Sequence, residues 1–212
     1  EDEAINILEK NNKILGVELS NNGKIKSKVV ILTTGTFLNG KIYFGNESQE
    51  AGRIGNSSSK VLAKFINKNF KTMRLKTGTP PRIYAKSINY DVLEPQISEN
   101  NGIFLSYFTK QNTNKKINCF ITKTNNKTHK IIRDNLDKSA MYSGIIKSQG
   151  VRYCPSIEDK ITKFGDRNGH NIFLEPEGLN SDLVYPNGIS NSLDKKIQLK
   201  FLRSIKGLEK CE

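Results

Sequence analysis

The chain has 212 residues, of which 35% are hydrophobic and 26% are charged, a composition typical of a globular protein rather than a disordered one. No apolar run approaches the roughly 20 residues that cross a bilayer, so we expect no membrane association. The formal net charge of +13 invites a polyanionic partner such as nucleic acid, although scattered surface lysines explain the charge equally well.

The sulfur and imidazole side chains do not predict a metal site. The cysteines are Cys119, Cys154 and Cys211, and their spacing fits neither a CxxC motif nor a disulfide framework. An odd number of cysteines suits a reducing compartment. Neither His129 nor His170 lies near a cysteine in the sequence, so zinc binding is not expected.

The first 38 residues predict a three-stranded meander over residues 5–8, 14–19 and 24–33, separated by asparagine-rich turns. The run of four apolar residues at 29–32 is typical of a strand that is buried on both faces. The small residues 33–36 follow it at once. Such a turn at the carboxyl end of a strand is where α/β folds place ligands.

A Gly- and Ser-rich stretch at residues 51–59 leads into a predicted amphipathic helix that begins near residue 60. One of Ser57, Ser58 and Ser59 would cap this helix. The loop and helix start would accept a phosphate or a flavin hydroxyl, or they form an ordinary surface cap; the spacing favours neither interpretation.

The two prolines within residues 76–82 bar a helix and indicate a domain junction. Beyond it, residues 103–108 and 118–122 predict strands, and residues 128–136 predict a helix. Further along, residues 185–188 read as a turn and residues 193–208 as an amphipathic helix.

Residues 150–160 contain the clearest candidate for a reactive side chain. Ser156 and Asp159 resemble a capping box, and Ile157, Ile161 and Phe164 would line one face of the following helix. Cys154 would then lie just before a helix amino terminus, where free amides and the helix dipole stabilise a thiolate. A small buried structural cysteine is the competing interpretation.

Other groups near this helix start leave the function open. Arg152 and Lys160 would add positive charge, and the same helix start would instead hold a dinucleotide pyrophosphate. Downstream, Glu175 and Glu177 would share one face of an extended segment, where they contact ribose hydroxyls or solvent.

Several long strings resemble the MnmG family, also called GidA. They are residues 32–40 (LTTGTFLNG), 74–82 (RLKTGTPPR), 152–160 (RYCPSIEDK), 173–178 (FLEPEG) and 185–190 (YPNGIS). The resemblance runs in order along essentially the whole chain. It is therefore more specific than any single glycine motif.

The resemblance implies an α/β fold. Residues 1–80 would form part of a Rossmann-like FAD-binding domain, residues 81–148 an inserted α/β domain, and residues 149–212 a return segment with the cysteine and a terminal helix. The sequence contains no GxGxxG flavin fingerprint and no initiator Met. We therefore expect a fragment that holds FAD poorly by itself.

The resemblance also implies a function. It implies a homodimeric enzyme that uses FAD, NADH and methylenetetrahydrofolate, together with an MnmE-type GTPase, to add an aminomethyl-type group to carbon 5 of the wobble uridine of tRNA. The location would be the bacterial cytoplasm or an organelle.

Site residues follow from the same resemblance. Cys154 would be catalytic and Ser59 would bind FAD, with Thr34 and Gly35 close to the flavin. The segment matched to the nicotinamide dinucleotide comprises Gly150, Val151, Arg152, Tyr153, Cys154, Pro155, Ser156, Ile157, Glu158, Asp159, Lys160, Ile161, Thr162, Lys163 and Phe164.

Two rival functions remain at this point. One is a folate- and FAD-dependent tRNA uridine methyltransferase, which shares the fold and the cofactors, although the insertion after Arg82 and the CPSIEDK string disfavour it. The other is a truncated, non-catalytic basic RNA-binding module, which would show salt-sensitive tRNA binding without NADH binding.

Overall fold

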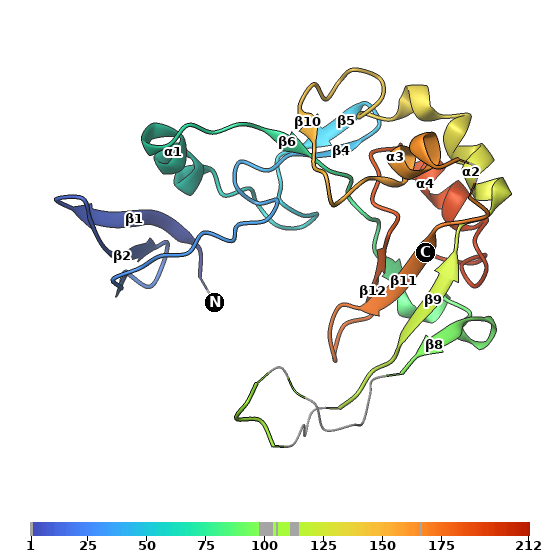
Figure 1. The fold of residues 1–212 in the computed structure, drawn as a ribbon, viewed down its shortest axis with the longest axis horizontal. Helices are drawn as coiled ribbons and strands as arrows, with labels where there is room; N and C mark the ends of the chain where they lie inside the picture. The colour runs from blue at the N-terminus through green and yellow to red at the C-terminus, as the bar shows by residue number, and fades with distance from the viewer. Residues whose placement is uncertain (1, 98–103, 105, 111–114, 166) are drawn as a thin grey trace. The chain divides into compact units, whose positions relative to one another are not determined.

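The computed structural model describes residues 2–97, 104, 106–110, 115–165 and 167–212 (Figure 1). The chain divides into two compact units. Unit 1 comprises Glu1–Tyr43 and Glu47–Arg74, and unit 2 comprises Phe44–Asn46 and Leu75–Glu212.

Unit 1 contains an antiparallel sheet of three strands, β1 (Ala4–Lys10), β2 (Lys13–Leu19) and β3 (Lys24–Lys26), in that order. The β1–β2 turn consists of Asn11 and Asn12, whose φ angles of 53° and 58° are left-handed. Asparagine tolerates this conformation, and two left-handed residues match the twist of a tight hairpin. The first two expected strands are therefore confirmed.

The predicted continuation of the third strand through residue 33 is wrong. β3 ends at Lys26, and the apolar run after it is exposed, at 69% for Val29, 81% for Ile31 and 45% for Leu32. A strand buried on both faces needs hydrogen-bonding neighbours and covering layers. Within the described residues no strand pairs with this run, so its apolar composition alone does not make it a strand.

Helix α1 (Lys60–Asn69) contributes apolar side chains to the core of unit 1. Its Leu62 and Ile66 pack with Ile7 of β1 in a small buried cluster. The expected helix start is right, because Ser59 is the N-cap residue, but its side chain makes no capping hydrogen bond. A two-stranded sheet of β4 (Ile42–Phe44) and β5 (Glu47–Gln49) lies where the chain passes between the units.

Unit 2 is built on a five-stranded antiparallel sheet in the order β7-β12-β11-β9-β8. Its strands are β7 (Ile83–Tyr84), β8 (Glu94–Gln96), β9 (Cys119–Lys123), β11 (Asn171–Pro176) and β12 (Leu183–Asn187).

The turn expected at residues 185–188 is wrong, because residues 185–187 belong to β12. Pro186 lies opposite Leu174 of β11 in the antiparallel register. The strand tolerates this proline although proline lacks an N–H for the ladder. The chain turns only afterwards, at Gly188, whose φ is +109°.

Three helices accompany the sheet of unit 2: α2 (Asn126–Arg133), α3 (Ile157–Lys163) and α4 (Lys195–Leu202). Short 3-10 turns occupy Ala85–Ser87, Tyr90–Val92 and Leu136–Lys138. Helix α4 is shorter than the expected span 193–208, although Phe201, Leu202 and Ile205 are buried as expected. The strand expected at 103–108 lies partly outside the described residues, and residues 104 and 106–108 are not in a strand.

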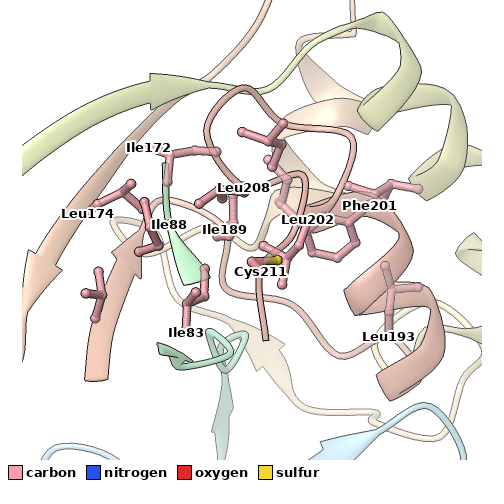
Figure 2. Close-up of a cluster of buried hydrophobic side chains, with 14 of the residues drawn as sticks. Ile83, Ile88, Ile172, Leu174, Ile189, Leu193, Phe201, Leu202, Leu208 and Cys211 are labelled. Atoms are coloured by element: carbon pink, nitrogen blue, oxygen red, sulfur yellow. The ribbon is translucent and has the colours of Figure 1, made fainter. Parts of the chain in front are cut away.

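The core of unit 2 joins strands and helices that are distant in the sequence. Figure 2 shows Ile172 and Leu174 of β11 in one cluster with Phe201 and Leu202 of α4. Ile83 of β7 lies in the same cluster. Residues from the expected segments 81–148 and 149–212 therefore share one core. In the part of the chain that the structure describes, no helix is long and apolar enough to span a bilayer.

Candidate active site around Cys154

Cys154 is exposed and follows a short parallel pairing of β10 (Gln149–Gly150) with β6 (Leu75–Lys76). The pairing continues one residue further, because the backbone N–H of Val151 donates to the carbonyl of Lys76 at 3.2 Å. The junction segment after β6 and the cysteine loop after β10 therefore run side by side. This arrangement brings Thr77 to Cys154.

The hydroxyl of Thr77 contacts two atoms of Cys154. Its Oγ1 lies 3.1 Å from the carbonyl oxygen of Cys154 and 3.3 Å from the Sγ atom. Two residues along, the N–H of Thr79 donates to the carbonyl of Asn191 at 2.8 Å, and the N–H of Asn191 donates back at 3.2 Å. The segment that carries Thr77, residues 76–79, is thus hydrogen-bonded to residues on both of its sides.

Gly78 allows this close approach. A Cβ atom at this position would lie 2.5 Å from the backbone nitrogen of Asn191 and 2.5 Å from the carbonyl carbon of Ser190. Real Cβ atoms do not approach backbone atoms so closely. A side chain at Gly78 would therefore push this segment away from Ser190 and Asn191, and Thr77 would move with it.

The amino terminus of α3 is satisfied by the chain itself. The hydroxyl oxygen of Ser156 accepts from the N–H of Asp159 at 3.2 Å, which confirms Ser156 as the cap. Asp159 does not complete the expected capping box, because its carboxylate accepts from the hydroxyls of Ser156 and Tyr142. The N–H of Ile157 donates to the carbonyl of Ser190 at 2.7 Å. These two amides are therefore not available to a phosphate.

The positive charge that reaches the thiol comes from Lys160. Burial lowers the pKa of Lys160, and the interaction with Cys154 partly offsets that shift. The ammonium group donates to the carbonyl of Gly188 at 2.8 Å. Arg152, which we expected beside the thiol, instead stacks on the exposed ring of Tyr153 with its guanidinium carbon 5.1 Å from the ring centroid.

A second polar group near Cys154 joins β12 to the junction segment. Nε of Arg82 donates to Oε1 of Glu177 at 2.6 Å, and the guanidinium lies 4.8 Å from the ring centroid of Tyr185. Burial raises the pKa of Tyr185, Arg82 lowers it, and the nearby Cys154 raises it further. Glu175 accepts from the amide of Asn187 at 3.1 Å. Both glutamates thus have protein partners.

Glu158 lies inside unit 2 although it belongs to the expected cofactor segment. Its side chain is fully buried, and Oε1 accepts from the hydroxyl of Ser139 at 3.0 Å and from the N–H of Ser192 at 2.9 Å. Its Oε2 is buried and has no hydrogen-bond partner among the residues that the structure describes. Burial raises the pKa of this carboxyl.

Some of the remaining residues of the expected cofactor segment are buried, and others are exposed to solvent. Ile157 and Ile161 are buried in the core of unit 2. Phe164, expected on the same face, is 50% exposed because the helix ends before it. The exposed members of the segment are Gly150, Arg152, Tyr153, Cys154, Thr162, Lys163 and Phe164.

The candidate flavin residues lie in unit 1. Thr34 and Gly35 form a turn closed by the N–H of Phe37, which donates to the carbonyl of Thr34 at 3.0 Å. Gly35 has a φ of 54°, and no atom of the described part of the chain lies within 4 Å of where its Cβ would be. Ser59 is tied to the same segment, because its N–H donates to the carbonyl of Phe37 at 3.0 Å. The structure therefore brings these three residues into one region.

A pocket of about 280 Å³ opens beside this turn. Thr34 lines it, together with mostly apolar side chains that include Ile7, Ile31 and Leu62. The open space beside Gly35 and this pocket lie in the same region of unit 1.

The fit of a nicotinamide dinucleotide in unit 2 depends on side chains. Because Ser156 and Ser190 occupy amides at the start of α3, such a ligand would have to be contacted by exposed side chains, among them Arg152, Tyr153 and Lys163. Within the described residues no three His, Cys, Asp or Glu side chains gather as metal ligands would.

Sequence reasoning missed Thr77 as a partner of Cys154. From the sequence, residues 76–82 indicate a domain junction, and residues 74–82 belong to the family resemblance, but neither pattern points to Cys154. Thr77 and Cys154 are 77 residues apart, and a threonine hydroxyl carries no sequence signal for its partner. The parallel pairing of β6 with β10 creates the contact.

The whole chain matches known proteins. The model of the family described as glucose inhibited division protein A matches residues 1–212. The chain is 50% identical over 212 residues to the "tRNA uridine 5-carboxymethylaminomethyl modification enzyme MnmG" of Buchnera aphidicola subsp. Cinara cedri, covering 99% of this chain and 33% of that protein.

Solved structures agree. Aquifex aeolicus GidA in one crystal form matches 100% of this chain and 36% of its own, with 43% identity and a TM-score of 0.77. In a second crystal form the coverage is 100% and 34%, the identity 40% and the TM-score 0.74. These matches confirm the expected α/β class. The chain spans about a third of the length of these relatives.

Proposed function

The chain belongs to the glucose-inhibited division protein A family, and on that premise we propose that it is part of an enzyme that modifies the wobble uridine of tRNA. The proposed product carries an aminomethyl or carboxymethylaminomethyl group on carbon 5. The observation that carries the proposal is the 50% identity, across 99% of this chain, with a relative that bears the name of this activity.

Cys154 is the residue we propose for the chemistry. Its thiol is exposed, so a substrate can reach it, whereas Cys211 is buried and Cys119 is half-buried in β9. Lys160 supplies a positive charge, and Thr77 supplies a hydrogen-bond donor to the sulfur. A thiolate is the reactive form of cysteine. Cys154 would attack the uracil ring or return a proton to it.

We propose FAD and NADH as cofactors and methylenetetrahydrofolate as the carbon donor. Thr34, Gly35 and Ser59 would contact the flavin through the open turn of unit 1, and Arg152, Tyr153 and Lys163 would contact the nicotinamide dinucleotide. When bound, the reduced flavin supplies electrons and the folate supplies the one-carbon unit. The complete protein would act as a homodimer with an MnmE-type GTPase, in the bacterial cytoplasm or an organelle.

Lys127 and Arg133 on α2, and Lys123 at the end of β9, are exposed and are candidates for contacts with tRNA phosphates. Arg82 is a weaker candidate for such a contact, because it already interacts with Glu177 and Tyr185. The net charge of +13 supports a polyanionic substrate in general terms.

The test uses the complete protein with its partner GTPase, in wild-type form and as Cys154→Ser. Nucleosides from treated tRNA are analysed by mass spectrometry, and bound flavin is quantified in parallel. We expect Cys154→Ser to keep its flavin and leave the wobble uridine unmodified. Cys119→Ser is the matched control, because it removes a thiol from β9 and should leave the product unchanged.

Two results would favour the rival functions. A 5-methyluridine product would indicate the folate-dependent methyltransferase. Salt-sensitive tRNA binding by the complete protein, without any NADH signal or modified nucleoside, would indicate an RNA-binding module. Normal modification by Cys154→Ser would remove the thiol from the mechanism while leaving the family assignment intact.

A further inference from the structure

We propose that Thr77 is a positioning residue for Cys154, whose hydroxyl holds the sulfur in place and stabilises it when it is ionised. The inference deepens the proposed function, because it rests on Cys154 taking part in the chemistry. Thr77 itself is not assigned any contact with substrate or cofactor.

The Thr77 hydroxyl has one proton and two acceptors on the same residue. Oγ1 lies 3.1 Å from the carbonyl oxygen of Cys154 and 3.3 Å from its Sγ. While the sulfur is a neutral thiol, the carbonyl is the better acceptor, since thiols accept weakly. Once the sulfur is charged, a charge-assisted hydrogen bond to it is the stronger one. A rotation of the O–H bond therefore transfers the donor to the thiolate without moving any heavy atom.

The backbone on both sides of Thr77 keeps this hydroxyl in place. Before it, the carbonyl of Lys76 accepts from Val151 at 3.2 Å. After it, Thr79 and Asn191 exchange two backbone hydrogen bonds, and Gly78 lies too close to Ser190 and Asn191 for any side chain. Because the Thr77 hydroxyl is already in position, it does not need to be ordered when negative charge develops on the sulfur.

The second charge near the sulfur is on Lys160, whose pKa reflects both burial and Cys154. Lys160 acts through space, whereas Thr77 makes a direct contact with the sulfur. Thr77 is therefore the group that fixes where the sulfur points, and Lys160 adds to the electrostatic stabilisation.

A purely structural role for Thr77 makes a different prediction. If the hydroxyl only ties the loop through the carbonyl of Cys154, its loss lowers stability but leaves the ionisation of the thiol unchanged. If it serves the sulfur, its loss changes the pH dependence of thiol reactivity. The experiment therefore measures reactivity against pH.

The complete protein is prepared as wild type, Thr77→Val, Thr77→Ser and Thr79→Val. Valine keeps the shape of threonine without the hydroxyl, and serine keeps the hydroxyl. Thr79→Val is the matched control, since it removes a hydroxyl two residues along the same segment, and among the described residues the Thr79 side chain makes no hydrogen bond. Each protein is alkylated with iodoacetamide from about pH 6 to about pH 10, and the Cys154 peptide is quantified by mass spectrometry.

In this reaction the thiolate forms an S–C bond and displaces iodide, and the thiol proton goes to the buffer. We expect Thr77→Val to move the midpoint of the pH–rate profile upward and to slow alkylation at about pH 7 by about threefold or more. Thr77→Ser and Thr79→Val should follow the wild type. An unchanged profile for Thr77→Val would overturn the proposal, as would the same shift in Thr79→Val.

A parallel assay of tRNA modification separates this inference from the proposed function. We expect Thr77→Val to lower kcat more than it raises KM, since it acts on the reacting sulfur and not on substrate binding. If the alkylation profile shifts but Cys154→Ser still modifies tRNA, Thr77 positions the thiol and the proposed role of Cys154 is wrong. If Cys154→Ser is inactive and the profile does not shift, only the role of Thr77 fails.

Discussion

The backbone N–H of Ser192 donates to Oε1 of the fully buried Glu158 carboxyl across 2.9 Å. Glu158 lies in the first turn of α3, four residues after Cys154, and Ser192 lies just before α4. The hydroxyl of Ser139 donates to the same oxygen. One buried carboxyl thus joins three segments of unit 2, namely α3, the residues just before α4 and the residue that follows the 3-10 turn Leu136–Lys138.

Replacement of Glu158 by alanine should destabilise the protein by about 2–4 kcal/mol, because it leaves the Ser192 N–H and the Ser139 hydroxyl buried without their acceptor and creates a cavity. Glu158→Gln keeps an acceptor oxygen and mimics the protonated carboxyl that burial favours. Its free energy of unfolding should stay within about 1 kcal/mol of the wild type. Denaturant unfolding measures both, and equal losses for the two variants would refute this role.

Acidification below neutral pH should destabilise unit 2 through two buried histidines. His129 and His170 lie 5.4 Å apart between ring centroids, and burial lowers the pKa of each. Positive charges lower them further, from Arg133 at His129 and from Lys160 and Arg167 at His170.

The unfolded chain therefore binds protons at these positions before the folded chain does. Above about pH 6.5, the pKa of histidine in the unfolded chain, the two neutral histidines make their full contribution to stability. This contribution is lost as the pH falls from there toward the lowered pKa values of the folded chain. Free energies of unfolding at about pH 7 and about pH 5 measure the loss. His129→Gln with His170→Gln should flatten this dependence; a slope equal to that of the wild type would contradict the assignment.

Gly78→Ala should lower stability by about 1–3 kcal/mol, because the added Cβ would lie 2.5 Å from backbone atoms of Ser190 and Asn191. Alkylation of Cys154 should also become slower, because the displaced segment carries Thr77. Gly178→Ala is the matched control, as no atom of any described residue lies within 4 Å of its Cβ position. Chemical denaturation gives the free energy of unfolding of both variants. Equal values would show that the segment around Gly78 moves without a loss of stability.

Local features of this chain follow from its sequence. Strands β1 and β2, helix α1 and the Ser156 cap of α3 each depend on neighbouring residues, and each was predicted close to its observed place. The start of α2 was missed by two residues. Asn125 and Thr128 form a capping box there, a pattern that departs from the usual Ser or Thr followed by Glu or Gln.

The errors occur where a segment depends on a distant partner. Residues 29–32 have the composition of a buried strand, yet they become one only when neighbouring strands pair with them. Residues 185–187 have the composition of a turn, yet β11 holds them in β12. In both cases the presence or absence of a neighbouring strand decides the structure, and local composition does not.

By itself, the sequence determined the α/β class, the family resemblance and the position of Cys154 before a capped helix, because periodicity, capping and long strings are local properties. Only the tertiary structure decided what surrounds the thiol. It placed Thr77 on the sulfur, turned Arg152 onto Tyr153 and buried Glu158 against Ser192. These contacts join residues far apart in the chain or depend on side-chain direction, and packing alone sets both.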